Sequence, residues 1–571
     1  MHFSGRMIVA GLLALAVVIL AQQSGRTAES PLAGRWKLSE VGAKDTALVL
    51  LKLSDKDGQL QAEAVSSPLL KDTMKVRSIK LDKGVIHLAL KFAGGPLEVT
   101  LYPPKGEKEP KLYRGTIKFG PQIILAQLER TDETALDKDN PQTTSEAGKL
   151  LLKASGLQDA KEQEEAFKAI IEKHGDTAAG FQAALSLVLL KARTAEKVDD
   201  VRAAAEQATK LAAAFGPDAE TNAIFTLAQR LGNSDTTAPL AAEYAKKADQ
   251  TFAKDDISNR RLGLLKAWAA ALRKAGKDDE AKEMDARVAK LEKDQEDDLI
   301  KHPIPFKFEP YKGRKAPSKR VAVVELFTGA QCPPCVSADI AFDAGLKAYK
   351  PADVVFLEYH LHIPGPDPMT NADSVARAKY YGNEVEGTPT AFINGKVTSP
   401  LGGVRDTSAY TYETLSEEIN AALETETPVT LTAKATRKGE KFEVEAEYAG
   451  VKKTGENTRL RFVVVEDVVH FVGRNKQREH HHVVRGFIGK PEGFEVKKAR
   501  DSQAVMMNVT DLKKTLGDYL EGYTDTFSMT KPFQGKENPL ELKNLKVIAL
   551  IQDDDTKEIL QAAQVDVPDA K

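Results

Sequence analysis

The chain has 571 residues, which is too long for one hydrophobic core, so several domains are expected. Its 81 Lys and Arg residues nearly balance its 83 Asp and Glu residues, and the formal net charge of -2 argues against a nucleic-acid-binding protein, which usually carries a basic excess. The two cysteines, Cys332 and Cys335, lie close together, so no pair remains for structural disulfides elsewhere.

The N-terminus has the pattern of an export signal. Arg6 precedes an apolar run from Met7 to Ala21, which is shorter than the roughly 20 residues that cross a bilayer but suits a signal peptide. We therefore predict a signal peptide over residues 1–28 and a periplasmic or secreted protein. No membrane span is expected after signal removal, and an uncleaved N-terminal anchor is the alternative.

Two different patterns follow the signal. Residues 31–130 predict a β-rich barrel or sandwich, because short apolar runs such as Val85–Phe92 are separated by Gly and Pro turn signals. Residues 146–298 are rich in Ala, Leu, Lys and Glu, and their apolar residues recur at helical spacing, which predicts a region of α-helical hairpins.

One helical hairpin is especially clear. Leu265 and Leu272 share one helical face, Gly276 breaks the helix, and Ala281 and Leu291 share the next face. This pair resembles a tetratricopeptide-type unit, which implies a module that binds a protein partner or acts as a spacer.

The second half of the chain divides again. Prolines at 303, 305, 310 and 317 predict a linker over residues 301–319. Residues 320–424 have an α/β pattern. Residues 428–571 predict an immunoglobulin-like β-sandwich, since apolar residues from Phe442 to Tyr448 alternate with charged ones.

The cysteines lie in Cys332-Pro333-Pro334-Cys335, between the buried-strand pattern of Val321–Phe327 and a helical stretch over Val336–Tyr349. This arrangement places Cys332 at a helix N-terminus, where unpaired N–H groups and the helix dipole stabilise a thiolate. Such sites lower a cysteine pKa from about 8.5 to between roughly 3.5 and 7.5. We expect the sulfur of Cys332 to be an exposed nucleophile.

Downstream elements complete an α/β order. A strand over Val354–Tyr359, a helix over Asp373–Tyr381, the segment Gly387-Thr388-Pro389-Thr390, an Asn394-Gly395 hairpin turn and a helix over Tyr412–Leu423 are predicted. With the Cys-Pro-Pro-Cys motif, this order resembles the thioredoxin superfamily. The resulting fold class is multidomain, with an α/β thioredoxin-like domain flanked by an all-α helical-hairpin region and two β-rich domains.

The resemblance also implies roles for single residues. Cys332 matches the attacking cysteine and Cys335 the resolving one, while a cis peptide before Pro389 would turn the backbone of Thr388 toward the sulfurs. Glu325 is the nearest match to the family's buried acid. The segments His481-His482-Val483-Val484-Arg485 and Val547–Asp553 are further similar to secreted bacterial thioredoxin-like proteins with a β-sandwich tail.

These patterns predict an extracytoplasmic thiol–disulfide oxidoreductase. It would act on protein thiols and disulfides, with an unidentified redox partner and without a cofactor or metal. The alternative is a secreted multidomain binding or scaffold protein with a structural or vestigial cysteine pair.

Two metal sites are alternatives to parts of this interpretation. In the first, the cysteines and His360 and His362 bind zinc as four ligands, but the thioredoxin context explains more residues. In the second, His470 joins the run His480-His481-His482; adjacent strand residues point to opposite faces, so a loop or strand end with one packed histidine is favoured.

Overall fold

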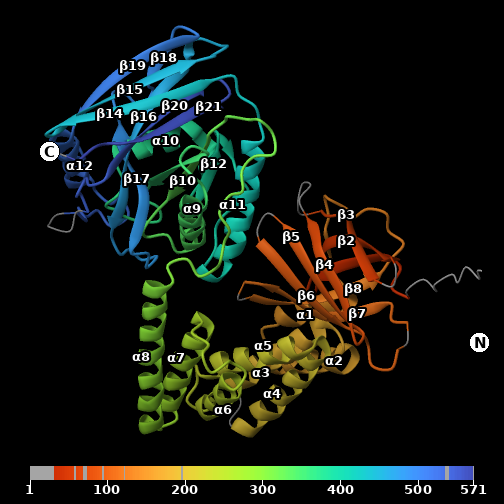
Figure 1. Ribbon diagram of the computed structural model, residues 1–571. Coiled ribbons are helices and arrows are strands. Elements are labelled where there is room, and N and C mark those ends of the chain that lie inside the picture. The colour runs from red at the N-terminus through yellow and green to blue at the C-terminus, as the bar shows by residue number, and fades with distance from the viewer. Residues whose placement is uncertain are drawn as a thin grey trace, which may run out of the picture.

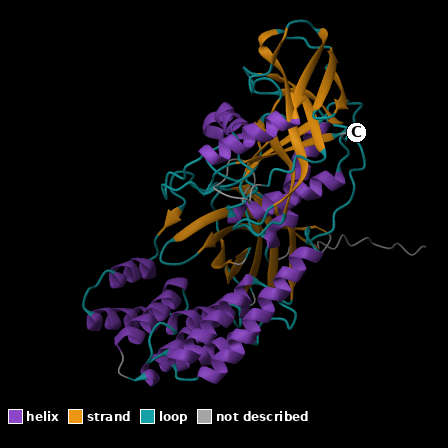
Figure 2. Cartoon of the chain, turned by 90° about the vertical axis from the view of Figure 1, so that its left-hand side faces the viewer, coloured by secondary structure: helices purple, strands orange, loops and turns teal. Residues whose placement is uncertain are grey.

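The computed structural model describes residues 31–569 except 57–58, 69–73, 93–94, 108, 121, 195–196 and 534–538. The predicted signal peptide therefore lies outside the described residues. The protein is multidomain, with helices and several β-sheets (Figures 1 and 2). Over this part of the chain, every helix is too short or too polar to span a lipid bilayer.

The N-terminal region is an antiparallel sheet in the order β3-β2-β1-β8-β7-β6-β5-β4, with β9 beside β2. Its first and eighth strands pair, and the apolar side chains on its inner face, Trp36 among them, form one buried core. The strands are β1 (Gly34–Glu40), β2 (Asp45–Lys56), β3 (Gln59–Ser66), β4 (Lys75–Asp82), β5 (Val85–Phe92), β6 (Gly95–Tyr102), β7 (Leu112–Phe119), β8 (Gln122–Arg130) and β9 (Gln142–Thr143).

Helices occupy the region from residue 146 to 301 and pack side by side below the sheets (Figure 1). Side-chain caps start several of them; Asp159, for example, accepts from the N–H groups of Lys161 and Glu162. Buried Ala and Leu residues join them in one core. They are α1 (Glu146–Ser155), α2 (Ala160–His174), α3 (Ala178–Thr194), α4 (Val198–Ala212), the 3-10 helix η1 (Ala213–Phe215), α5 (Pro217–Leu231), α6 (Ala238–Asp249), α7 (Asn259–Lys274) and α8 (Asp278–Lys301).

The region that holds the cysteines has a mixed sheet between helices. Strand β10 pairs in parallel with β11 and antiparallel with β12. Helices α9 and α11 pack on one face of this sheet and α10 on the other. The elements are β10 (Ala322–Thr328), η2 (Pro333–Cys335), α9 (Val336–Ala348), β11 (Val354–His360), α10 (Ala372–Tyr381), η3 (Gly382–Glu384), β12 (Thr390–Ile393), β13 (Lys396–Val397), η4 (Arg405–Thr407) and α11 (Ser408–Leu423).

The C-terminal region adds strands to that same sheet. Its order is β13-β12-β10-β11-β17-β16-β20-β21, and β18 pairs with β16. A second sheet, β14-β15-β19, shares a core with β16, β20 and α12. The elements are β14 (Thr430–Lys438), β15 (Lys441–Ala449), β16 (Gly455–His470), β17 (Glu479–Phe487), β18 (Phe494–Val496), β19 (Arg500–Asn508), α12 (Val509–Gly522), β20 (Leu545–Asp553) and β21 (Ile559–Asp566).

The sheet that contains β10 and β11 thus continues across the predicted boundary at residues 424–428. Strands β11 and β17 meet in parallel, with Glu358 opposite Val483. The immunoglobulin-like identity of the C-terminal region stays a prediction. The predicted linker has neither helix nor strand between residues 302 and 321, and Phe308 and Tyr311 pack against the core under α9 and α11.

Contacts also join the N-terminal sheet to α11. Tyr410 donates a hydrogen bond to the carbonyl of Phe92, and Lys91 pairs with Glu417 at 2.7 Å. At the other end of the helical region, Arg405 pairs with Asp298 of α8 at 3.0 Å. The region with the cysteines is therefore in contact with both N-terminal regions.

The turn between β12 and β13 provides a test of how closely the C-terminal region packs on this sheet. Gly395 has φ +82°, and a Cβ there would lie 1.8 Å from the carbonyl oxygen of Lys557. We expect Gly395→Ala to destabilise this part of the chain by about 2–4 kcal/mol, from the positive φ plus the clash. Gly439→Ala is the control, because φ is +55° there but nothing lies within 4 Å; its expected cost is about 1 kcal/mol. Calorimetric unfolding would show the difference, and equal shifts would contradict this packing.

Candidate redox site

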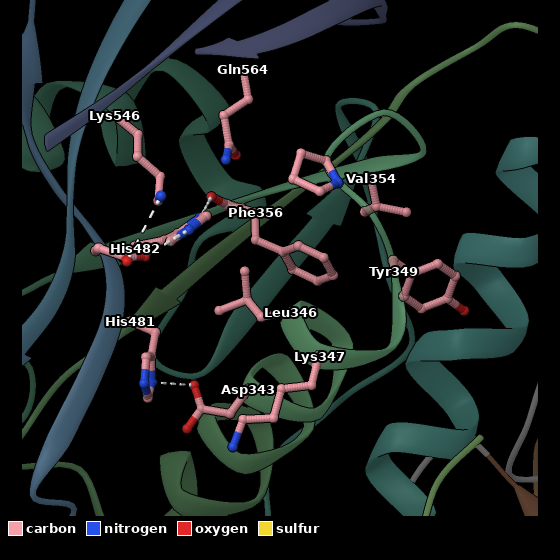
Figure 3. A pocket seen from close by; sticks show the side chains of 12 residues that line it. Asp343, Leu346, Lys347, Tyr349, Val354, Phe356, His481, His482, Lys546 and Gln564 are labelled. Carbon is pink, nitrogen blue, oxygen red and sulfur yellow. Dashed lines mark hydrogen bonds and ion pairs between the residues drawn. The ribbon is translucent and has the colours of Figure 1, made fainter. Parts of the chain in front are cut away.

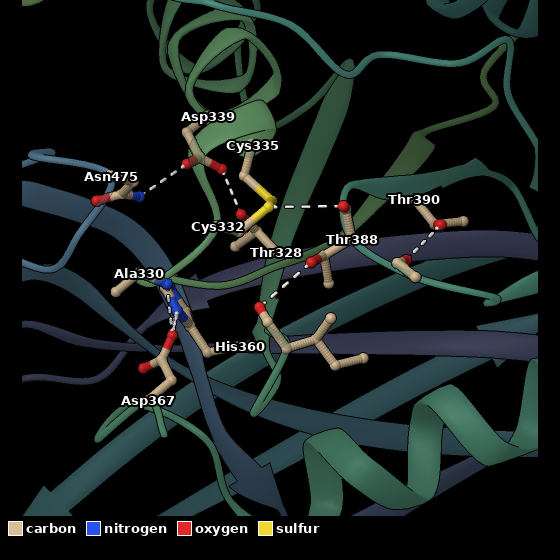
Figure 4. Close-up of a disulfide and its surroundings, with 12 residues drawn as sticks. Thr328, Ala330, Cys332, Cys335, Asp339, His360, Asp367, Thr388, Thr390 and Asn475 are labelled. Carbon is tan, nitrogen blue, oxygen red and sulfur yellow. Dashed lines mark hydrogen bonds and ion pairs between the residues drawn. A yellow bond between two sulfur atoms is a disulfide. The ribbon is translucent and has the colours of Figure 1, made fainter. Parts of the chain in front are cut away.

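The two cysteines form a disulfide at the start of a helix (Figure 4). Cys332 precedes η2, and α9 continues directly from Cys335. Two prolines fit this first turn because their missing N–H groups would have no partner within the helix. The loop is closed by the N–H of Cys335, which donates to the carbonyl of Cys332 at 3.2 Å. The sulfurs thus lie at a helix N-terminus, as the spacing predicts.

The segment Thr388–Pro389, directly before β12, lies against the disulfide. The Thr388–Pro389 peptide bond is cis, as the family resemblance implies. Sγ of Cys332 lies 3.5 Å from the carbonyl oxygen of Thr388, which points at the sulfur in Figure 4. Four of the five predicted site residues, Cys332, Cys335, Thr388 and Pro389, are therefore brought together.

The expected exposure of the sulfur is wrong. Cys332 is 1% exposed and Cys335 is fully buried, although Pro333 and Pro334 between them are exposed. Segments distant in the sequence lie against the motif on two sides. The N–H of Gly403 donates to the carbonyl of Pro334 at 2.7 Å.

On the other side, the segment between β16 and β17 contacts the residues just before Cys332. Asn475 donates its N–H to the carbonyl of Ala330 at 2.9 Å. The N–H of Arg474 donates to the side chain of Gln331 at 3.2 Å. The motif is thus in contact with neighbouring segments on both sides, and the sulfur of Cys332 is buried.

Glu325 is not brought to the disulfide. Alternate residues of β10 face opposite sides of the sheet, and Glu325 lies on the side of Val323 and Phe327, away from α9. There its carboxylate accepts two hydrogen bonds from Arg377, at 2.7 and 3.0 Å, and one from Tyr381. The pairing of Glu325 with Arg377 explains why a buried acid is present at this position, and it involves no contact with the sulfurs.

The acid on the α9 side is Asp339, one helical turn after Cys335 and beside the disulfide in Figure 4. Thr328 donates to its carboxylate at 2.6 Å. Burial, reinforced by the negative charge of Glu358, raises the pKa of Asp339 well above its usual value, against opposing effects of Thr328 and His360. Helical spacing from Cys335 was the sequence signal that would have singled out this residue.

The raised pKa predicts a pH-dependent stability. Between the usual carboxyl pKa of 3.8 and the raised value, the folded chain keeps a proton on Asp339 that the unfolded chain has lost. The contribution of this group to stability therefore falls as the pH rises through that window. We expect Asp339→Asn to gain stability relative to the natural chain as the pH rises from about 4 to 7.

Hydrogen exchange of β10 and β11 peptides, corrected for intrinsic rates, measures this difference locally. The two tryptophans, Trp36 and Trp268, lie in other regions, so fluorescence would not report on it. Asp518→Asn, at an exposed position of α12, is the control. A stability difference that stays constant with pH would contradict the raised pKa of Asp339.

A buried polar network continues behind the loop before Cys332. Asp367 accepts from the N–H of Ala330 at 2.6 Å and contacts Nδ1 of His360 at 2.8 Å. Burial alone would raise the pKa of Asp367, but His360 and backbone N–H groups hold it below its usual value. Burial opposes the charged imidazole, yet Asp367 and Glu358 raise the pKa of His360 to about 10.

The predicted loop or strand end with one packed histidine is only partly right. His480, His481 and His482 are all in β17, and His480 and His482 are both buried. His481 pairs with Asp343 at 2.8 Å, while Nδ1 of His482 lies 3.1 Å from the carbonyl of Phe356.

His481 and His482 help to line a pocket of about 220 Å³ (Figure 3). Leu346, Tyr349 and Phe356 supply apolar parts of its wall, and neither cysteine belongs to its lining. The zinc site of cysteines with His360 or His362 is not formed, because both sulfurs are in the disulfide and His362 stacks on Tyr523.

Known proteins show little similarity to this chain. No family model matches the chain, and no curated protein matches it. Among solved structures, it is similar to HBP35 of Porphyromonas gingivalis, at 15% identity and a TM-score of 0.31 over 45% of this chain and 78% of that one. That likeness is too weak to support an argument about fold or function.

Proposed function

We propose that residues 320–424 form a thioredoxin-like domain and that the protein is an extracytoplasmic thiol–disulfide oxidoreductase. The observation that carries the proposal is the placement of the Cys332–Cys335 disulfide at a helix N-terminus, with Sγ of Cys332 3.5 Å from the carbonyl of Thr388 in a cis Thr–Pro segment. The helix N-terminus stabilises a thiolate, and we assign to the Thr388 backbone the role of pairing with an extended substrate segment.

In the reductive direction the exchange is balanced in two steps. The Cys332 thiolate attacks one sulfur of a substrate disulfide, forms a mixed disulfide and releases the other substrate sulfur as a thiolate. The Cys335 thiolate then attacks the sulfur of Cys332, which releases the second substrate thiolate and restores the Cys332–Cys335 disulfide. Two electrons pass to the substrate. An external dithiol or redox partner then supplies two electrons that reduce the Cys332–Cys335 disulfide again. Asp339 is the group we assign to proton transfer at Cys335.

Dithiothreitol-dependent reduction of insulin tests this activity. We expect the natural chain to accelerate the reaction and Cys332→Ser to leave only the rate of dithiothreitol alone, because the attacking thiolate is lost. Gln331→Ala, next to the motif but without a thiol, is the matched control and should retain most of the acceleration. Equal rates for the natural chain and Cys332→Ser would remove the proposal.

A second function is favoured by one observation, the burial of both cysteines. A binding or scaffold protein with a structural disulfide would bury them in the same way, and its helical region would then bind a protein partner. The two functions differ in the redox behaviour of the disulfide. A structural disulfide resists reduction by glutathione, and its potential lies below about −300 mV.

A further inference from the structure

Behind the loop that precedes Cys332, three buried side chains converge from two strands. Glu358 and His360 belong to β11 and His480 to β17, and one ligand atom from each lies within 4.8 Å of the others. Nε2 of His360 lies 3.3 Å from Oε1 of Glu358, and Nδ1 of His480 lies 3.9 Å from the same oxygen. The two imidazole rings meet edge to face, with their centroids 4.9 Å apart.

Each histidine is held through its other nitrogen. Nδ1 of His360 lies 2.8 Å from Asp367, whose carboxylate is fixed by the N–H groups of Ala330 and Met369. Nε2 of His480 lies 3.2 Å from the carbonyl of Phe471. Both rings therefore turn their remaining nitrogen toward Glu358. Histidine ligands of metals are oriented in this way, with the second nitrogen donating to a carboxylate or a carbonyl.

The distances suit a metal better than a direct hydrogen bond. Nε2 of His360 is buried and has no hydrogen-bond partner, although it lies 3.3 Å from Oε1 of Glu358. Ligand atoms that lie about 2.0–2.1 Å from a tetrahedral zinc ion are about 3.3–3.4 Å from one another. The 3.3 Å between His360 and Glu358 matches that edge length, whereas the 3.9 Å between His480 and Glu358 is longer.

The charges around the cluster also favour a cation. Glu358, Asp367 and Asp339 are buried carboxyl groups, and burial of an uncompensated negative charge is costly. On β17, Arg485 is already paired with Glu466 at 2.8 Å, and His481 is paired with Asp343 at 2.8 Å. Either protons on the histidines and Asp339 or a bound cation can compensate these carboxylates, and the unpaired Nε2 of His360 offers a cation a ligand.

We propose that Glu358, His360 and His480 bind one divalent transition-metal ion of the zinc type, with a fourth position left for water. Two imidazoles and one carboxylate are a ligand set that suits such ions. The ion would cross-link β11 and β17, which share a single registered pair, Glu358 with Val483. Through Asp367 and Ala330 it would also brace the loop before Cys332.

Because all three ligands are buried, the full-length chain has to be unfolded, stripped with a chelator and refolded with Zn²⁺ before the metal is counted. We expect about one zinc per chain after desalting, and the same ratio for the Cys332→Ser/Cys335→Ser variant. His360→Gln and His480→Gln should retain less than about a tenth of it. His470→Gln, at an exposed position of β16, is the control and should bind normally.

X-ray absorption of the refolded natural chain decides the case even if the histidine variants fail to fold. Nitrogen and oxygen neighbours at about 2.0–2.1 Å, with imidazole scattering and no sulfur, would support the site. A natural chain that refolds without retaining zinc, sulfur ligands on the metal, or folded histidine variants that keep full occupancy would each overturn it. In the first case, protons compensate the cluster.

Discussion

We expect replacement of Cys335 by Ser to make covalent complexes accumulate between Cys332 and substrate proteins, if the protein has the proposed activity. Cys335 lies three residues from Cys332 and is bonded to it, so its attack on a mixed disulfide is intramolecular. Well-oriented intramolecular reactions have effective molarities of about 10⁵ M or more, against the millimolar concentrations of external thiols. Loss of Cys335 should therefore slow resolution by several orders of magnitude. Non-reducing electrophoresis and mass spectrometry of the purified variant would measure the complexes.

The controls separate attack from resolution. Cys332→Ser retains a thiol at Cys335, which is fully buried within the first helical turn, so it should form few complexes. The double variant should form none. Complexes of equal yield on Cys332→Ser and Cys335→Ser would contradict the assignment of Cys332 as the attacking cysteine.

Replacing Arg377 by Met should lower the local free energy of unfolding around β10 and α10 by about 3–5 kcal/mol, because it leaves the buried Glu325 carboxylate without its counter-ion. Arg377 donates to both oxygens of Glu325 and to Gln552 at 2.9 Å, and it is 3% exposed. Hydrogen exchange of β10 and α10 peptides would measure the loss.

Two variants calibrate that loss. Lys379→Met, at an exposed position of the same helix, should change stability by less than about 0.5 kcal/mol. Glu325→Leu/Arg377→Met removes both charges, and we expect it to be more stable than Arg377→Met alone, since well-packed apolar replacements of buried ion pairs are often tolerated. A double variant less stable than Arg377→Met would contradict the pairing.

Local patterns predicted many of the elements. The strand expected over Val321–Phe327 is β10, shifted by one residue, and Val354–Tyr359 lies within β11. Continuous apolar runs identify these strands because both their faces are buried between helices. The helix α12 was missed within a region interpreted as β-rich. Its apolar residues Val509, Leu512, Leu516 and Leu520 do recur at helical spacing, so the signal was present.

Other features depend on contacts between distant segments, which no local pattern contains. Gly403 and Asn475 lie against the Cys-Pro-Pro-Cys loop from far along the chain, and their hydrogen bonds to Pro334 and Ala330 accompany the burial of Cys332. The joining of β11 to β17 is of the same kind, and it brings His480 to Glu358.

The prediction that Glu325 is the acid beside the cysteines was wrong in its placement for a different reason. The resemblance made Glu325 the nearest match to the family's acid, although its spacing from the motif is one residue longer, and alternation along a strand places it on the other face of the sheet. Thr328, not Glu325, shares the α9 side, and it donates to Asp339. The structure therefore brings the cysteines and the cis proline segment together and places Glu325 elsewhere, while the roles of these residues stay predictions.

The reduction potential of the Cys332–Cys335 pair tests the account most directly. The full-length protein is equilibrated in glutathione and dithiothreitol buffers of known potential, quenched with acid and alkylated, and the reduced fraction is counted by mass spectrometry. We predict reversible two-electron behaviour with a midpoint above about −300 mV, as for catalytic disulfides. A disulfide that stays oxidised at potentials below that value would contradict a redox function and leave a structural disulfide in a binding protein.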